Sequence, residues 1–266
     1  MRKTFFIPTL ALGAVTLAIA AVGGAATAPT KCGGTTDATT GNDTITGSAA
    51  NNNLSGLTGE DTIVGLAGND CIDGGDGPDS LTGGFGNDRM FGEAGDDEIA
   101  GGAGNDRIDA GAGANYVEGG FGNDTVAGGD GPDDFSGGRG DDELHGAGGI
   151  DYLAGGLGSD RLNGGAGPDD LSGGRGGDKL FGADGDDILS GGLDADRLSG
   201  GIGNDVLDGG RGDDIFEAGP GDDFIDAADG TIERVGCGPG ADTVLADAGD
   251  RLFNCERINR LQLTTR

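Results

Sequence analysis

The sequence predicts an all-β solenoid, and three observations support that fold class. The chain of 266 residues contains 63 glycines and only 5% aromatic residues, which is too little apolar material for an ordinary globular core. An apolar residue recurs every nine positions from Ile45 to Ile225, at all 21 positions and without insertion or deletion. Glycine and aspartate recur with the same period, and such short repeats are typical of stacked β-solenoids.

Each nonapeptide unit follows the pattern G-G-x-G-x-D-x-U-x, where U is the apolar residue. Aspartate lies two positions before U in 19 of the 21 units, and the exceptions are Asn52 and Asn115. Glycine lies two positions before the aspartate in 19 units, and the exceptions are Ala50 and Asp194. We expect a six-residue turn, in which glycine permits positive φ, followed by a three-residue strand whose U side chain points inward.

This pattern resembles the hemolysin-type calcium-binding repeat of RTX proteins over residues 41–226. The resemblance implies a right-handed parallel β-roll with two units in each 18-residue coil, so that 21 units form about ten coils. It also implies that calcium ions lie between successive turns on the same edge, bound by aspartate carboxylates and glycine carbonyl oxygens. The implied carboxylate ligands are Asp43, Asp61, Asp70, Asp79, Asp88, Asp97, Asp106, Asp124, Asp133, Asp142, Asp151, Asp160, Asp169, Asp178, Asp187, Asp196, Asp205, Asp214 and Asp223.

Calcium would supply the stability that the sequence lacks. One apolar side chain in nine residues buries too little surface to offset the entropy lost when so glycine-rich a chain becomes ordered. The stacked aspartates would also repel one another. We therefore expect the chain to be largely disordered without calcium and to fold as roughly 15 ions bind. Positions next to Ala50, Asn52, Asn115 and Asp194 are the exceptions, because these residues depart from the pattern.

Residues 1–28 are predicted to be a secretory signal peptide, since a basic start precedes an apolar run from Phe5 to about Val22 and then small residues. An uncleaved membrane anchor is the alternative, and no later segment is long and apolar enough to span a bilayer. The predicted location is therefore secreted, extracellular or at the cell surface. RTX proteins usually leave the cell through a type I exporter that reads a C-terminal signal, so this N-terminal segment departs from the family pattern.

The four cysteines, Cys32, Cys71, Cys237 and Cys255, are an even number, which in an exported chain indicates two disulfides. Four cysteines allow three pairings, and we favour Cys32–Cys71 and Cys237–Cys255 because each pair brackets one end of the array. Free or metal-binding thiols are the alternative, although the spacing matches no zinc pattern. Residues 29–40 and 227–266 lie outside the register and are predicted to be the N-terminal and C-terminal caps that a solenoid needs.

The formal charge of −31 excludes nucleic acid as a partner, because phosphate binding needs a basic surface. The sequence has no H-E-x-x-H or G-x-S-x-G motif and a single histidine, His145, so we predict no enzymatic activity.

The leading interpretation is a secreted calcium-binding structural protein of the cell surface or matrix. The second is a calcium-dependent interaction module that presents one edge of the rod to a partner or to itself. An ice-binding solenoid is the third, and it is disfavoured because the outward positions form no regular threonine rows. On the edge that the second interpretation uses, large apolar residues alternate with arginine at Phe121, Arg139, Leu157, Arg175, Leu193 and Arg211.

Overall fold

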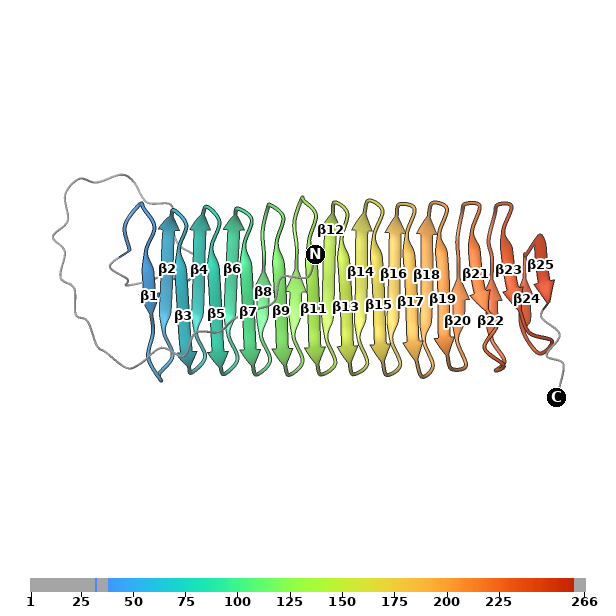
Figure 1. The fold of residues 1–266 in the computed structure, drawn as a ribbon, viewed down its shortest axis with the longest axis horizontal. Coiled ribbons are helices and arrows are strands. Elements are labelled where there is room, and N and C mark those ends of the chain that lie inside the picture. The colour runs from blue at the N-terminus through green and yellow to red at the C-terminus, as the bar shows by residue number, and fades with distance from the viewer. Residues whose placement is uncertain (1–31, 33–37, 261–266) are drawn as a thin grey trace.

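The computed structural model describes Cys32 and residues 38–260; the predicted signal peptide and most of the predicted N-terminal cap lie outside these residues. The described part contains 25 strands and no helix, and it winds into a parallel β-solenoid of about twelve turns (Figure 1). This confirms the predicted fold class. No helix of the described residues has the length and apolar character needed to cross a membrane.

Two parallel sheets face each other along the rod. The odd sheet contains the odd-numbered strands in sequence order, and each strand pairs with the one a coil later. Its strands are β1 (Thr44–Thr46), β3 (Thr62–Ala67), β5 (Ser80–Phe85), β7 (Glu98–Ala103), β9 (Tyr116–Phe121), β11 (Asp134–Arg139), β13 (Tyr152–Leu157), β15 (Asp170–Arg175), β17 (Ile188–Leu193), β19 (Val206–Arg211), β21 (Phe224–Ala227), β23 (Thr243–Ala246) and β25 (Arg257–Arg260).

The even sheet contains the even-numbered strands, also in sequence order. In Figure 1 its arrows run opposite to those of the odd sheet, as expected for the two sides of one coil. Its strands are β2 (Asn53–Thr58), β4 (Cys71–Asp76), β6 (Arg89–Ala94), β8 (Arg107–Asp109), β10 (Thr125–Ala127), β12 (Glu143–Gly148), β14 (Arg161–Ala166), β16 (Lys179–Asp184), β18 (Arg197–Ile202), β20 (Ile215–Glu217), β22 (Arg234–Gly236) and β24 (Arg251–Phe253).

The core is the double row of U side chains between the sheets. Leu153, for example, pairs in register with Phe135 before it and Leu171 after it. The U residues are almost completely buried from Ile63 to Ile225, whereas Ile45 at the first coil is only partly buried. The nine-residue period therefore sets both the core and the strand register.

Most strands are longer than the sequence analysis predicts. They span six residues and include both glycines of the pair, as in β13, where Gly156 pairs with Gly138 and Gly174. The expected three-residue strand occurs only at a minority of positions, such as β8 and β10. The ladder continues because glycines of successive coils lie in register with no side chain between the backbones, and the turn shortens accordingly.

The solenoid continues beyond the last nonapeptide unit. Strands β22 to β25 extend both sheets, although they belong to the segment predicted as the C-terminal cap. Thr243 pairs with Phe224 at a spacing of 19 residues instead of 18, because one additional residue enters this coil. The insertion ends the nine-residue period without ending the coil, and the extra strands account for turns beyond the predicted ten.

Both favoured disulfides form. Cys32 bonds to Cys71 in β4, and Cys237 bonds to Cys255, at Cα–Cα distances of 5.5 and 5.2 Å. The second disulfide joins neighbouring coils at the C-terminal end, and the described residues contain no free cysteine.

Candidate metal-binding turns

The turn aspartates form two rows, one on each edge of the rod. Edge A consists of the turns that lead from the odd sheet to the even sheet, and edge B of the turns that lead back. Nearly all of the predicted ligands are buried, and the exception is Asp43 in the first coil, which is half-buried. Edge A carries Asp70, Asp88, Asp106, Asp124, Asp142, Asp160, Asp178, Asp196 and Asp214; edge B carries Asp43, Asp61, Asp79, Asp97, Asp133, Asp151, Asp169, Asp187, Asp205 and Asp223.

One carboxylate oxygen of each aspartate is used to join successive coils. The backbone N–H of Asp142 donates to Oδ1 of Asp160 over 2.8 Å, and the N–H of Asp160 donates to Oδ1 of Asp178 over 2.8 Å. The same bond repeats at a spacing of 18 residues along both edges. This ladder fixes each carboxylate in the plane of its turn and points the second oxygen inward.

The second carboxylate oxygen, Oδ2, has no hydrogen-bond partner. Eighteen of the described aspartates have a fully buried Oδ2 without a partner, and seventeen of them are predicted ligands; Asp43 and Asp214 are the two predicted ligands outside this set. A buried carboxylate oxygen without a partner is strongly unfavourable. A row of such atoms therefore indicates that something else satisfies them.

At most turns a glycine, with no side chain of its own, lies beside Oδ2 and a carbonyl oxygen of the next coil. A Cβ placed on Gly65 would lie 2.3 Å from Oδ2 of Asp70 and 2.6 Å from the carbonyl oxygen of Gly83 in the next coil. On edge B, a Cβ on Gly56 would lie 2.2 Å from Oδ2 of Asp61 and 2.6 Å from the carbonyl oxygen of Gly74. The missing glycine side chain thus leaves room between a carboxylate and a carbonyl oxygen.

Burial disfavours the ionised form of these carboxylates in the metal-free chain. It raises the pKa of Asp160 to about 7, and the negative charges of Asp178 and Asp142 in the same row add to the effect. The pKa values of Asp124 and Asp196 are raised to about 7 for the same reasons. A divalent cation between the turns would remove both the unsatisfied charge and the repulsion along the row.

Oxygen ligands at these turns would come mostly from the backbone. Among residues 38–260 and Cys32, no group of three or more His, Cys, Asp or Glu side chains is placed to hold a metal ion. Calcium accepts backbone carbonyls together with carboxylates, and glycine-rich turns expose those carbonyls. The donor set fits calcium and not a metal that prefers nitrogen or sulfur.

Asn115 interrupts the row on edge B. Its Nδ2 donates to the carbonyl oxygens of Gly111 and Gly113 over 3.3 and 3.4 Å, and to Oδ1 of Asp133 over 3.0 Å. These three acceptors are the oxygen types that a cation would take. The neutral amide of Asn115 therefore satisfies these oxygen atoms by hydrogen bonding, whereas a metal ion would satisfy them by coordination in the neighbouring turns.

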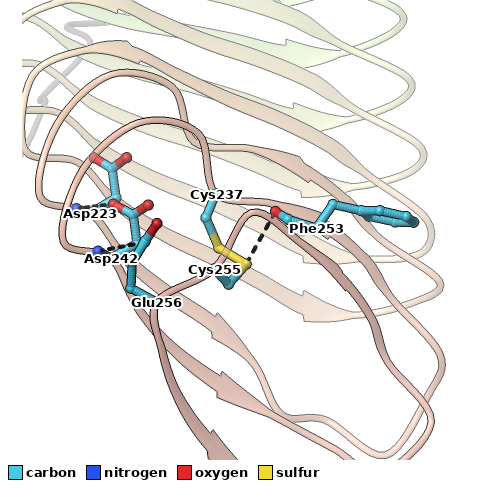
Figure 2. Close-up of a disulfide and its surroundings, with 6 residues drawn as sticks. All are labelled: Asp223, Cys237, Asp242, Phe253, Cys255 and Glu256. Carbon is cyan, nitrogen blue, oxygen red and sulfur yellow. Dashed lines mark hydrogen bonds between the residues drawn. A yellow bond between two sulfur atoms is a disulfide. The ribbon is translucent and has the colours of Figure 1, made fainter.

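Sequence reasoning missed the carboxylates that extend both rows beyond Asp214 and Asp223. Figure 2 shows the end of edge B, where the N–H of Asp223 donates to Oδ1 of Asp242 over 3.0 Å and the N–H of Asp242 donates to Oε2 of Glu256 over 3.4 Å. On edge A, Glu233 takes the next position, with a buried Oε2 that has no partner. The G-P-G-A-D turn at residues 238–242 was the available signal, but it lies one residue out of register.

The comparisons with known proteins agree with the repeat register. The profile of the RTX calcium-binding nonapeptide repeat matches residues 37–72, 65–99, 73–108, 91–126, 127–162, 163–198 and 199–231. The chain therefore belongs to the family of RTX calcium-binding repeat proteins. No curated protein matches the chain. Among solved structures, it is similar to a hyperactive, Ca²⁺-dependent, β-helical antifreeze protein from an Antarctic bacterium, with a TM-score of 0.40 and 24% identity over 83% of this chain and 82% of that chain.

Proposed function

We propose that this protein is a secreted structural protein of the cell surface or matrix, whose rod folds around calcium ions held in the turns of both edges. The repeat array is a structural rather than a catalytic fold. The observation that carries the proposal is the row of buried Oδ2 atoms without a hydrogen-bond partner, most of them near a carbonyl oxygen of the next coil. Secretion is supported by the N-terminal sequence and by the two disulfides, which persist in oxidising compartments.

The ligands would be the nineteen predicted aspartates together with Asp242, each ion bridging two successive turns of one edge. Calcium supplies a doubly positive, oxygen-seeking centre of flexible geometry. The chain supplies the carboxylates, orients them through the Oδ1 ladder, and leaves space through its glycines. Because the metal-free array has little core and much like charge, the free energy of calcium binding would appear as free energy of folding.

Calcium titration of the mature chain tests this function directly. Circular dichroism should change cooperatively from a coil spectrum to a β spectrum as calcium rises, in the range of about 10⁻⁴–10⁻³ M that extracellular modules show. Calorimetry on the same sample should give roughly 15 ions per chain. A β spectrum that excess chelator leaves unchanged would contradict the proposal.

A pair of variants separates the ligand row from overall charge. Asp160 is buried in a turn with an unpartnered Oδ2, whereas Asp134 lies on the exposed face of β11. Asp160→Asn should lower the calcium stoichiometry by about one to two ions, because each ligand is shared by two bridging positions. Asp134→Asn removes the same charge and should leave the stoichiometry unchanged. Equal losses in the two titrations would refute the assigned register.

A second function, calcium-dependent adhesion through edge A, is favoured by one observation. Phe85 and Phe121 are 71% and 58% exposed on this edge, and the Arg139 guanidinium stacks over the Phe121 ring at 5.2 Å. Exposed aromatic and arginine side chains are typical of binding surfaces. A pull-down with and without calcium, comparing the parent with the Phe121→Ser/Leu157→Ser/Leu193→Ser variant, tests this function. If the parent and the variant capture the same amount of partner, edge A is not the adhesion surface.

A further inference from the structure

The even sheet presents a column of basic side chains along the described part of this acidic molecule. The column occupies the outward position immediately before each U residue. In β14, β16 and β18 three consecutive strands place Arg161, Lys179 and Arg197 directly beside one another. All members of the column are exposed, and they are Arg89, Arg107, Arg161, Lys179, Arg197, Arg234 and Arg251.

The odd sheet carries the opposite charge at the same position. From β1 to β23 this position contains no basic residue. In the middle of the rod acids alternate with tyrosines, and Tyr116 and Tyr152 are 42% and 54% exposed. The column from β7 to β21 reads Glu98, Tyr116, Asp134, Tyr152, Asp170, Ile188, Val206 and Phe224.

Like charges lie next to one another along part of the basic column. Neighbouring strands lie about 4.8 Å apart, and like charges directly opposite each other repel. Arg161 has one acidic neighbour in its column, Glu143 at 3.7 Å, and its guanidinium stacks over Phe181 at 4.5 Å. Lys179 and Arg197 take the next two positions of the column, in register with Arg161. Such a column is more easily explained by an anionic partner than by folding of the rod alone.

The spacing along the two columns identifies the partner. Arg161 and Arg197 are 36 residues apart, which is two coils, and Lys179 lies midway. Asp134 and Asp170 are also 36 residues apart, and Tyr152 lies midway. Two copies of the rod share the same rise per coil. Placing the two arginines against the two aspartates therefore places the lysine over the tyrosine ring, a favourable cation–π arrangement.

We propose that the even sheet of one calcium-loaded chain packs face to face on the odd sheet of a second copy, with Arg161, Lys179 and Arg197 against Asp134, Tyr152 and Asp170. Sheets pack face to face at about 10 Å, within reach of these side chains. Because the two surfaces differ, a pair keeps the odd sheet of one copy and the even sheet of the other free, so the contact repeats and builds an open stack. This inference rests on the proposed function, since the uncompensated charge of the calcium-free turns would oppose association.

Sedimentation velocity of the full chain in saturating calcium tests the contact. The parent should associate in a concentration-dependent manner at low salt, and 0.5 M NaCl should reverse the association because exposed charges are screened. Two charge-reversal variants address the two faces separately. Arg161→Glu/Arg197→Glu and Asp134→Arg/Asp170→Arg should each weaken association by about tenfold or more, because like charges would then face each other.

Mixing the two variants provides the decisive measurement. The acidic even sheet of the first variant complements the basic odd sheet of the second, so an equimolar mixture should regain the association that each has lost alone. Arg175→Glu/Arg211→Glu makes the same charge change at the same 36-residue spacing on edge A and is the matched control, expected to associate like the parent. Calcium stoichiometry and the circular dichroism spectrum should be the same in all four proteins, which separates failure of the contact from failure of calcium binding.

Several results would overturn the proposal. A calcium-loaded parent that stays monomeric at low salt excludes the contact, and retention of that monomer on heparin, lost in Arg161→Glu/Arg197→Glu, would assign the basic column to a polyanion instead. A mixture that fails to regain association excludes the pairing of these two faces. Loss of association in Arg175→Glu/Arg211→Glu, with both face variants unaffected, would move self-association to edge A.

Discussion

At the scale of single residues, the difference between aspartate and asparagine decides what a turn can bind. A turn aspartate presents a second oxygen that lacks a partner, whereas Asn115 presents an NH₂ group that donates to three acceptors of its own. The backbone of the two kinds of turn is nearly the same, because the N–H of Asn115 still donates to Oδ1 of Asp133 over 3.0 Å. The substitution therefore gives these acceptors a neutral donor and keeps the coil.

Restoring the carboxylate should restore the site. Asn115→Asp is expected to raise the calcium stoichiometry by about one to two ions per chain, because the new carboxylate faces neighbours both before and after it in the row. Ala114→Asp is the matched control, since it adds the same charge at the exposed position one residue earlier. Calorimetric titration of both variants checks the prediction, and an unchanged stoichiometry in Asn115→Asp would show that the turn lacks another ligand.

At the scale of strands and turns, the glycine pairs allow successive coils to approach closely. Gly192 in β17 has φ of +109°, and a Cβ there would lie 2.4 Å from the carbonyl oxygen of Gly174 in the preceding coil. Ala147 and Ala183 occupy the same slot in other units with φ of +84° and +83°. The slot therefore accepts a side chain only when the backbone rotates into the left-handed region.

Gly192→Ala should destabilise the folded, calcium-bound chain by about 1–2 kcal/mol, the usual penalty for a residue with a Cβ in this region. Gly148→Ala should change stability by less than about 0.5 kcal/mol, because its Cβ would meet nothing closer than Asp130 Oδ1 at 3.6 Å. Urea unfolding in saturating calcium measures both variants. Similar effects at the two positions would mean that the close approach between coils does not limit stability.

The strands and turns also show which structural features can be predicted from this sequence. The U residues and turn aspartates follow a strict nine-residue period, so the core, the register and the two carboxylate rows were readable from the sequence. The strand length was not, because glycine pairs that look like turn residues pair in register once coils stack. Glu233 and Asp242 were missed because one inserted residue moves them out of phase, and Glu256 because it lies only 14 residues after Asp242. The Oδ1 ladder depends on orientation within the turn, which no period encodes.

At the scale of the whole molecule, the rod is a one-dimensional array whose stability depends on neighbouring coils. Its carboxylates are spread along two edges, so their repulsion grows with the length of the array. The arginines of edge A, at every second coil from Arg139 to Arg211, are far fewer than these carboxylates. Calcium is one means of removing that charge. Protonation is another, and the buried carboxylates should accept protons well above their ordinary pKa.

The metal-free rod should therefore be favoured by acid. Burial raises the pKa of Asp79 from 3.8 to about 7 and those of Asp97 and Asp169 to about 6 in the folded chain, whereas the unfolded chain keeps ordinary values near 3.8. Between about pH 4 and 7 the folded chain thus binds more protons than the unfolded chain. Its stability must fall as the pH rises through this range.

In excess chelator, the circular dichroism spectrum should contain more β structure at pH 5 than at pH 8, and calcium should restore the β spectrum at pH 8. The sequence has an isoelectric point near 4.1, so sedimentation at pH 5 must confirm that the β signal belongs to a monomer. More β structure at pH 8 than at pH 5 in chelator would mean that the turn carboxylates are stable as anions without a cation. Calcium would then bind to the rod without being required for its folding.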